Sequence, residues 1–490
     1  MRRKLAAALG AAAATLMCGC AVGPNFTRPP PPTAAAYGAG SAPLTGDQHI
    51  VSGMGIPGEW WTLFRSAALD RLVKQALAAN PNVGAAQAAL RQAHELYIVQ
   101  RSGFLPNIQG ALNGDRSEFP TRTLTSPTVA SSSTYTLYTA QLTLSYAPDV
   151  FGLTRRQVEM AKAQFDSSRF QLEAVYLTLS SNVVVTAVQE ASLRGQIEAT
   201  TRLLQLQHQL TDTVQRQRAL GTADDLDVLA QQSAEAQTEQ TLPPLQKQLG
   251  ESRDALTALL GRLPSEEPAE TFHLDELTLP AELPLSVPSK LIEQRPDVRQ
   301  AEENLHAASA ADGVALAGML PQFAINADLG SSALTLGRLF TPYTGFWDAG
   351  ASLTQTLFDA GALLHKRRAA DAALDQAAAQ YRAAVILACQ NVADTLLALR
   401  ADAAAMQASR AAEIAAKQTF DLAQAQRALG TVGVVAVLNA EQAYRQAEIT
   451  LVQSQASRYS DTAGLFQALG GGWWNRNGEP RYEQVGATGK

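Results

Sequence analysis

The feature that most constrains the fold is an internal repeat. The hexapeptide Gln-Arg-Ala-Leu-Gly-Thr occupies residues 217–222 and again residues 426–431, at an offset of 209 residues. The same offset links Gly152 with Gly361. Further matches, at this offset or at the nearby offset of 215, are Val228-Leu229 with Val437-Leu438, Leu260-Gly261 with Leu469-Gly470, and Leu105-Pro106 with Leu320-Pro321. A unit of about 200 residues is therefore present twice, and the fold must use one arrangement of elements two times.

Each copy contains a helix of unusual length. From Leu153 to Leu220 the sequence has no proline and one glycine, and from Ala362 to Leu429 it has neither. A helix over such a run would extend about 100 Å at roughly 1.5 Å per residue, whereas globular helices average about 10–14 residues. It therefore needs lateral support. Apolar residues at three- and four-residue steps supply a coiled-coil seam, for example Leu172, Tyr176, Leu179 and Val183, then Leu203, Leu206, Leu210 and Val214.

A sharp turn follows each long helix. Gly221 and Gly430 can adopt the left-handed conformation that ends a helix, and Thr222 or Asp224 can cap the helix that returns. We therefore expect a helical hairpin at each tip. Pro243-Pro244 is expected to break or kink the first returning helix.

Period-two alternation replaces the helical pattern between Pro106 and Tyr146 and between Pro321 and Phe358. The apolar residues of the clearest alternating runs are Leu142, Leu144 and Tyr146 in the first copy and Phe323, Ile325, Ala327 and Leu329 in the second. This pattern predicts strands with one apolar and one polar face. Runs of about 10 residues suit an outer-membrane barrel, although a soluble antiparallel sheet alternates in the same way. A barrel needs about eight strands or more, so two strands per copy would require an oligomer.

The N-terminus is typical of an exported lipoprotein. Arg2, Arg3 and Lys4 precede the only long uncharged apolar run, which ends in Met17-Cys18-Gly19-Cys20. That run is shorter than the roughly 18 residues of a membrane helix, so we expect no helical membrane domain. We predict a signal peptide over 1–19 and lipid on Cys20, with Ala21 favouring the outer membrane. A plain secretory cleavage that leaves the cysteines unmodified is the alternative. With Cys20 acylated, only Cys389 remains, so the mature chain has no intrachain disulfide.

Several function classes are disfavoured. The net charge of −6 argues against a nucleic-acid partner, which needs a basic face. His94-Glu95 lacks the second histidine of a zinc-hydrolase helix, no phosphate-binding loop occurs, and the six histidines are scattered without cysteine partners. We therefore expect no enzyme activity, no cofactor and no metal.

Several motifs together resemble one family. They are Cys20-Ala21-Val22-Gly23-Pro24-Asn25-Phe26 with Arg28-Pro29, Trp60-Trp61-Thr62-Leu63-Phe64, Asn80-Pro81-Asn82-Val83, Arg295-Pro296-Asp297-Val298 and the two Leu-Gly-Thr tips. With these motifs the chain resembles the outer-membrane factor lipoproteins of tripartite efflux systems, which are relatives of TolC, OprM and NodT. The resemblance extends from Cys20 to Trp474. The resemblance implies a mixed α/β membrane protein: a homotrimer whose 12 strands form one transmembrane barrel, four per chain, continuous with a periplasmic barrel of helices.

The resemblance also implies partners and a function. Family members dock by their hairpin tips on a periplasmic adaptor, which links them to an inner-membrane proton-driven pump of the RND type. We therefore expect an outer-membrane exit duct for small molecules and drugs, lipid-anchored and extending into the periplasm. The outer-membrane channel of a type I protein secretion system is one alternative. A coiled-coil scaffold lipoprotein without a pore is another, although it would need no amphipathic strands.

These expectations divide the chain into segments. They are a signal peptide (1–19), a lipidated extended tether in which Pro29–Pro32 disfavours packed structure (20–59), a first repeat (60–262), a linker (263–294), a second repeat (295–472) and a C-terminal tail (473–490).

The candidate sites lie at the tips. We expect adaptor contacts from Gly221, Thr222, Gly430 and Thr431. Family members narrow the channel with acidic residues six and nine positions after the second tip glycine, where this chain has Ala436 and Asn439. Asp227 stands six positions after Gly221. Our hypothesis is a mainly apolar constriction with cation affinity from the acidic residue, formed by Asp227, Val434, Val435, Leu438 and Asn439.

Overall fold

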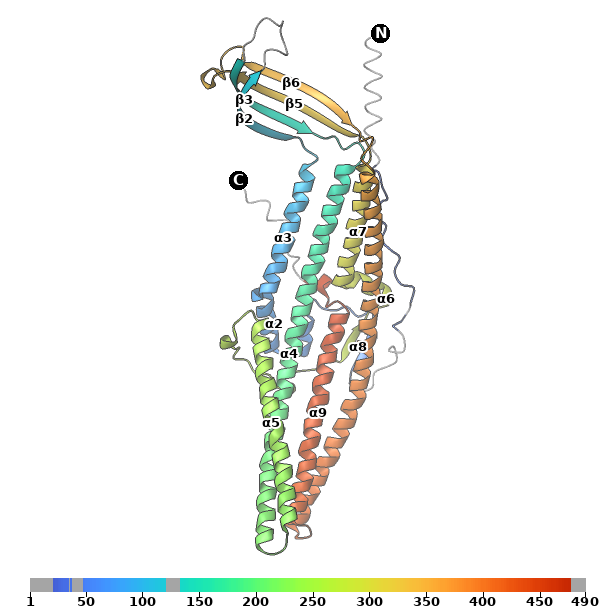
Figure 1. Cartoon of the computed structure of the whole chain (residues 1–490). Coiled ribbons are helices and arrows are strands. Elements are labelled where there is room, and N and C mark those ends of the chain that lie inside the picture. Colours follow the sequence, from blue (N-terminus) through green and yellow to red (C-terminus); the bar gives the residue numbers. More distant parts are fainter. Residues whose placement is uncertain (1–20, 35, 38–46, 120–132, 477–490) are drawn as a thin grey trace. The chain divides into compact units, whose positions relative to one another are not determined.

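The structure is a computed structural model that describes residues 21–34, 36–37, 47–119 and 133–476 (Figure 1). The predicted signal peptide, the lipid acceptor Cys20 and residues 477–490 of the predicted tail lie outside the described residues. Contacts divide the described chain into two compact units. The first takes the described parts of residues 21–28, 90–167 and 301–381, and the second takes those of residues 29–89, 168–300 and 382–476. Each unit takes segments from both repeats, so the repeats of the sequence are interleaved rather than folded side by side as separate bodies.

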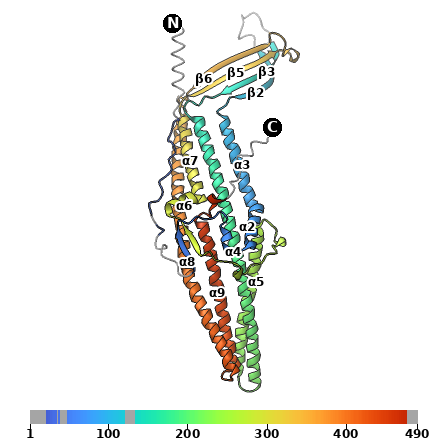
Figure 2. The same cartoon turned by 180° about the vertical axis from the view of Figure 1, so that it is seen from behind.

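The first unit holds four strands in one antiparallel sheet (Figure 2). In sheet order they are β2 (Asn107–Phe119), β3 (Ser133–Tyr146), β5 (Gln322–Ala333) and β6 (Gly345–Thr354). The register aligns the apolar side chains, since Leu142 lies opposite Leu329, which lies opposite Trp347. On the other face Asp328 lies opposite Thr143 and Asp348. The prediction of strands with one apolar and one polar face is confirmed.

The described start of the chain packs against α4 (Leu153–Ala219). The buried Arg156 donates hydrogen bonds to the carbonyl of Val22 at 3.2 Å, to that of Gly23 at 3.0 Å and to Oδ1 of Asn25 at 2.9 Å. A buried guanidinium needs acceptors, and an extended segment with free carbonyls supplies them. The prediction that residues 20–59 form a tether without packed structure is therefore wrong for this segment.

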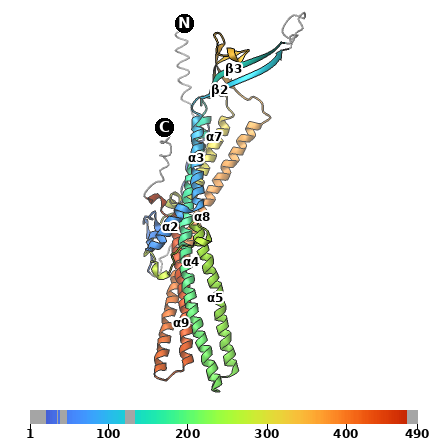
Figure 3. The same cartoon turned by 90° about the vertical axis from the view of Figure 1, so that its left-hand side faces the viewer.

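The second unit holds the greater part of two helical hairpins, as the turns predicted. The helices α4 and α8 (Ala362–Ala428) have 67 residues each, and α5 (Asp225–Leu259) and α9 (Val434–Ala468) return from their ends. The two tips lie at the same end of this unit (Figure 3). The helix α5 is continuous across Pro243 and Pro244, so the predicted break does not occur. Residues 239 and 240, whose carbonyls lose their helical donors, are exposed, and water can bond them instead.

The second unit also has an aromatic core. Trp60, in the short helix η2 (Trp60–Phe64), stacks on Phe466 of α9 with 5.3 Å between ring centroids. The strand β1 (His49–Ser52) pairs in parallel with β4 (Glu282–Leu285). Part of the predicted tether and part of the predicted linker are therefore folded components of this unit. This unit also contains α2 (Ala67–Ala79) and α6 (Pro288–Gln294), whereas most of α3 (Pro81–Ser102) and α7 (Pro296–Ala317) belongs to the first unit.

The helix α8 carries an exposed apolar stretch. It contains an 18-residue window with a mean hydropathy of 1.3, long and apolar enough by composition to cross a membrane, and only 22% of that window is buried within the chain. Sequence analysis did not expect such a window. Alanine-rich helix surfaces of this kind also suit close packing against other helices, so the stretch needs a cover that the single chain does not supply.

Candidate docking tips and channel constriction

The two tips have the same turn geometry. Gly221 has φ of +76° and Gly430 has φ of +73°, and a Cβ at either position would meet nothing within 4 Å. Backbone conformation, rather than space, therefore requires glycine here. The hydroxyl of Thr222 donates to the carbonyl of Gln217 at 3.0 Å, and that of Thr431 to Gln426 at 2.9 Å. The four predicted tip residues thus form two equivalent exposed turns.

Each tip also exposes a leucine that sequence analysis did not select. Leu220 is 79% exposed and Leu429 is 80% exposed, immediately before the turn glycine. Both belong to the repeated hexapeptide, which was the signal that could have identified them. An apolar side chain so exposed at both tips offers a partner protein a contact surface.

Asp227 takes part in a capping box at the start of α5. The backbone N–H of Asp227 donates to Oδ1 of Asp224 at 2.9 Å, and the backbone N–H of Asp224 donates to Oδ2 of Asp227 at 3.2 Å. Asp224 is thus the N-cap, one of the two alternatives that the sequence allowed. The carboxylate of Asp227 stabilises the helix start and remains exposed.

The apolar residues of the predicted constriction pack against α4 within the chain. Leu438 is buried in a cluster with three leucines of α4, and Val434 and Val435 pack against that cluster. The leucines are Leu203, Leu206 and Leu210. Residues 434, 435 and 438 share one face of α9, and that face covers the first hairpin within the chain. Among the predicted constriction residues, only Asp227 and Asn439 have exposed side chains.

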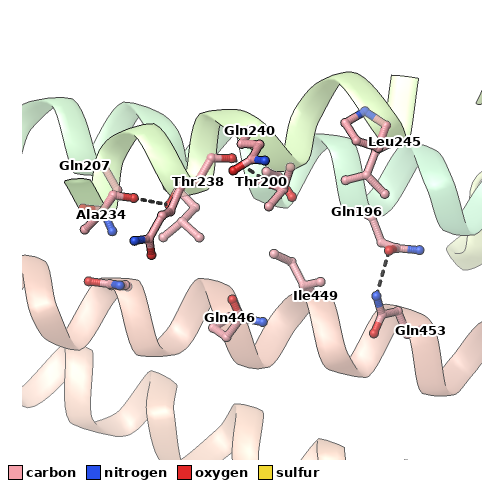
Figure 4. Close-up of a pocket in the computed structure, with 15 residues that line it drawn as sticks. Gln196, Thr200, Gln207, Ala234, Thr238, Gln240, Leu245, Gln446, Ile449 and Gln453 are labelled. Carbon is pink, nitrogen blue, oxygen red and sulfur yellow. Dashed lines mark hydrogen bonds between the residues drawn. The ribbon is translucent and has the colours of Figure 1, made fainter. Parts of the chain in front are cut away.

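A groove between the hairpins is rich in uncharged polar side chains (Figure 4). It has a volume of about 660 Å³ and lies between α4, α5 and α9. The amide of Gln453 donates to Gln196 at 2.8 Å across it. Its glutamines and threonines are Gln196, Thr200, Gln207, Gln237, Thr238, Gln240, Thr241, Gln442, Gln446 and Gln453. Sequence analysis missed this groove because three separated helices contribute to it.

No group of three or more histidine, cysteine, aspartate or glutamate side chains that could hold a metal ion occurs among the described residues. The free thiol of Cys389 is half-buried in α8, and burial raises its pKa. The described tips and groove are built from turns, apolar side chains and amides.

Comparisons with known proteins agree with this architecture. The sequence profile described as outer membrane efflux protein matches residues 72–262 and 287–471, one block for each repeat. The pyoverdine export outer membrane protein OpmQ of Pseudomonas putida is 29% identical over 91% of this chain and 94% of its own length. The toluene efflux pump outer membrane protein TtgC of the same species is 27% identical over 96% of each chain. The solved outer-membrane channel OprN superposes with a TM-score of 0.82 at 26% identity, covering 93% of this chain and 100% of that one.

Proposed function

Because the chain belongs to the outer membrane efflux protein family, we propose that it is the outer-membrane exit duct of a tripartite efflux pump. Small molecules leave the periplasm through its channel. The observation that carries this proposal is a sheet with one apolar face, whose strands continue directly into the helices that form the two hairpins. The relatives named for pyoverdine export and toluene efflux support small molecules as cargo.

The open edges of the sheet and the exposed apolar stretch of α8 support a homotrimer. Within the chain β2 and β6 are the edges of the four-stranded sheet, so each leaves one row of backbone hydrogen-bonding groups unpaired. Such an edge is too costly within lipid, where only closed barrels satisfy every backbone group. Three chains would place 12 strands in one barrel, and neighbouring chains would also cover the apolar window of α8.

Export by the intact system tests the function. The chain, expressed with its adaptor and pump in cells that lack an outer-membrane factor, should restore resistance to the pump's small-molecule substrates. It should migrate as a trimer after cross-linking in mild detergent. Restored secretion of a protein substrate without any change in drug accumulation would instead support the type I secretion alternative.

The exposed tips support contact with a periplasmic adaptor. Thr222→Arg and Thr431→Arg place a large charge beside the turn without changing the turn glycine, and together they should abolish adaptor cross-linking and drug resistance. The matched control is Thr419→Arg, at an exposed threonine of α8 away from the tips. Unchanged cross-linking in the double variant would reject the docking assignment.

The exposed side chains of Asp227 and Asn439 are our candidates for the channel constriction. Three ionised copies of Asp227 around a threefold axis would attract cations. Multivalent cations added on the periplasmic side of a planar bilayer should block conductance, and Asp227→Ala should relieve that block. A block that survives Asp227→Ala but disappears in Asn439→Ala would contradict this assignment.

Lipid on Cys20 would anchor the N-terminus in the outer membrane. Two or more acyl chains give stable anchoring where one gives only marginal binding. Mass spectrometry of the mature N-terminus should show an acylated Cys20. Because the barrel itself spans the membrane, Cys20→Ser should lower sorting efficiency while trimers still form.

A further inference from the structure

A second pocket lies in the second unit, apart from the tips and the groove. Its volume is about 380 Å³, within the range of small-ligand sites. It opens between α8, α9, the residues that precede β1 and those that precede β4. Its lining consists of Asp47, Gln48, Leu279, Ala281, Ala403, Met406, Gln407, Arg410 and Arg458.

Two arginines line the pocket. Arg458 is only 3% exposed, and its guanidinium donates to the backbone carbonyl of Leu399. Arg410 stands on α8 with an exposed side chain. Within the described part of the chain, neither arginine has a carboxylate close enough for a salt bridge. A buried guanidinium without a bonded anion is a binding element for a carboxylate.

A buried amide adds a second recognition element. Gln48 is 2% exposed, and its Nε2 donates to the carbonyl of Pro280 at 2.9 Å and to Oγ1 of Thr462 at 3.4 Å. Its Oε1 is buried and has no hydrogen-bond partner in the described structure. An acceptor left unbonded in a buried position favours a ligand that brings an N–H or O–H donor.

The remaining lining limits the size and charge of the ligand. Leu279, Ala281, Ala403 and Met406 offer apolar contacts beside the polar groups. Asp47 also lines the pocket, so a ligand with two negative charges would meet a like charge. A single carboxylate next to a donor and a short apolar group matches all of these features.

We propose that this pocket binds a small carboxylate that carries an adjacent N–H donor and a short apolar side chain. An N-acyl amino acid or the C-terminal residue of a peptide has this chemistry. The carboxylate lies between Arg410 and Arg458, and the ligand N–H donates to Oε1 of Gln48. The pocket shares no lining residue with the groove or the tips.

A carboxyl pair beside Arg458 links the pocket to pH. Burial, followed by a hydrogen bond and charge repulsion from Asp461, raises the pKa of Asp402 to about 7. The other charged groups facing this pair and the pocket are Arg458 on α9, Arg410 on α8 and Asp47 before β1. Below the raised pKa Asp402 is uncharged, and above it Asp402 carries a negative charge. Since that charge competes for Arg458, the pocket binds a carboxylate more tightly below the raised pKa.

Calorimetry on the full-length trimer in detergent tests the site. At pH 6, N-acetyl-L-alanine should bind at least about tenfold more tightly than its uncharged amide, the size expected for hydrogen bonds to a charged group. Arg410→Gln and Gln48→Leu should each weaken N-acetyl-L-alanine binding. Arg427→Gln, an exposed arginine at the far end of α8, is the matched control and should not change it.

The pH dependence gives an independent readout. Binding by the wild-type protein should weaken from pH 6 to pH 8, whereas Asp402→Asn, which keeps the uncharged form, should bind equally at both. A short peptide ending in alanine that binds more tightly than N-acetyl-L-alanine would identify a chain end as the occupant, and equal affinity would identify the free acid. Equal binding of acid and amide, or unchanged binding in Arg410→Gln and Gln48→Leu, would overturn the proposal.

Discussion

The two hairpins share a turn but begin their returning helices in different ways. At the first tip Asp224 and Asp227 form a capping box, so the start of α5 is stabilised by its own side chains. At the second tip the equivalent N-cap is Gly433, which offers no side-chain cap, and Leu438 packs on α4 instead. The difference teaches that a repeated turn can be held locally in one copy and by tertiary contact in the other.

The two hairpins also differ in how deeply one pair of equivalent leucines is buried. Leu229 and Leu438 stand 209 residues apart, at corresponding positions of the two repeats. Leu438 is 6% exposed and Leu229 is 62% exposed. The second hairpin therefore depends on the first for its packing, while the first hairpin leaves the corresponding face open to another chain or to a partner.

The largest expected effect separates these two leucines. Leu438→Ala should destabilise the start of α9 by about 2–5 kcal/mol, because it leaves a cavity among the leucines of α4. Leu229→Ala should change local stability far less. Hydrogen exchange of the first turns of α5 and α9 in the purified trimer measures both. Equal protection losses in the two variants would remove the distinction between the hairpins.

A smaller effect is expected equally at both tips. Gly221→Ala and Gly430→Ala should each cost about 1–2 kcal/mol, because a residue with a Cβ is strained at positive φ. Exchange of the amides around each turn measures the cost. If one variant were neutral, the two turns would not be equivalent.

Loss of the local cap should affect the first hairpin alone. Asp224→Ala should destabilise the start of α5 by about 1 kcal/mol, since the backbone N–H of Asp227 loses its side-chain acceptor. The exchange rates of residues 225–228 should rise while those of α9 stay constant. A rise in both helices would mean that the cap also supports the second hairpin.

The smallest effect tests whether the missing cap can be restored. At Gly433 φ is −78° and a Cβ would meet nothing within 4 Å, so Gly433→Asp fits without strain. It should stabilise the start of α9 by a few tenths of a kcal/mol, the usual difference between glycine and aspartate at an N-cap. Slower exchange at residues 434–437 would show it, whereas faster exchange would mean that the added carboxylate disturbs the packing on α4.

Sequence was sufficient for the two long helices, the strands of the antiparallel sheet and the tip turns, because local chemistry determines them. Proline-free runs bounded by Gly221 and Gly430 define the long helices to within one residue. Alternation gave the faces of the strands, and the observed register joins those faces across the sheet. The repeat also predicted two equivalent turns, which the hydrogen bonds of Thr222 and Thr431 confirm.

The sequence could not predict which element packs against each apolar or polar face. An apolar run such as Val434, Val435 and Leu438 suits both a channel constriction and packing on α4, and only the fold shows which contact is made. The glutamine-lined groove and the carboxylate pocket each combine residues from elements far apart in the chain. Arg156 likewise binds residues more than 130 positions away, a separation that no local pattern reveals.

Arg156 limits how far a lipid on Cys20 could move relative to the protein. Residues 22, 23 and 25 accept hydrogen bonds from its buried guanidinium. A Cβ on Gly152 would lie 2.6 Å from the Cα of Ala21, so the chain is packed against the protein from the residue after Cys20. One residue of chain spans about 3.5 Å at most. Acyl chains on Cys20 would therefore lie within about one residue of the packed protein. They would fix the depth of the sheet in the bilayer, which a long flexible linker would leave free to vary.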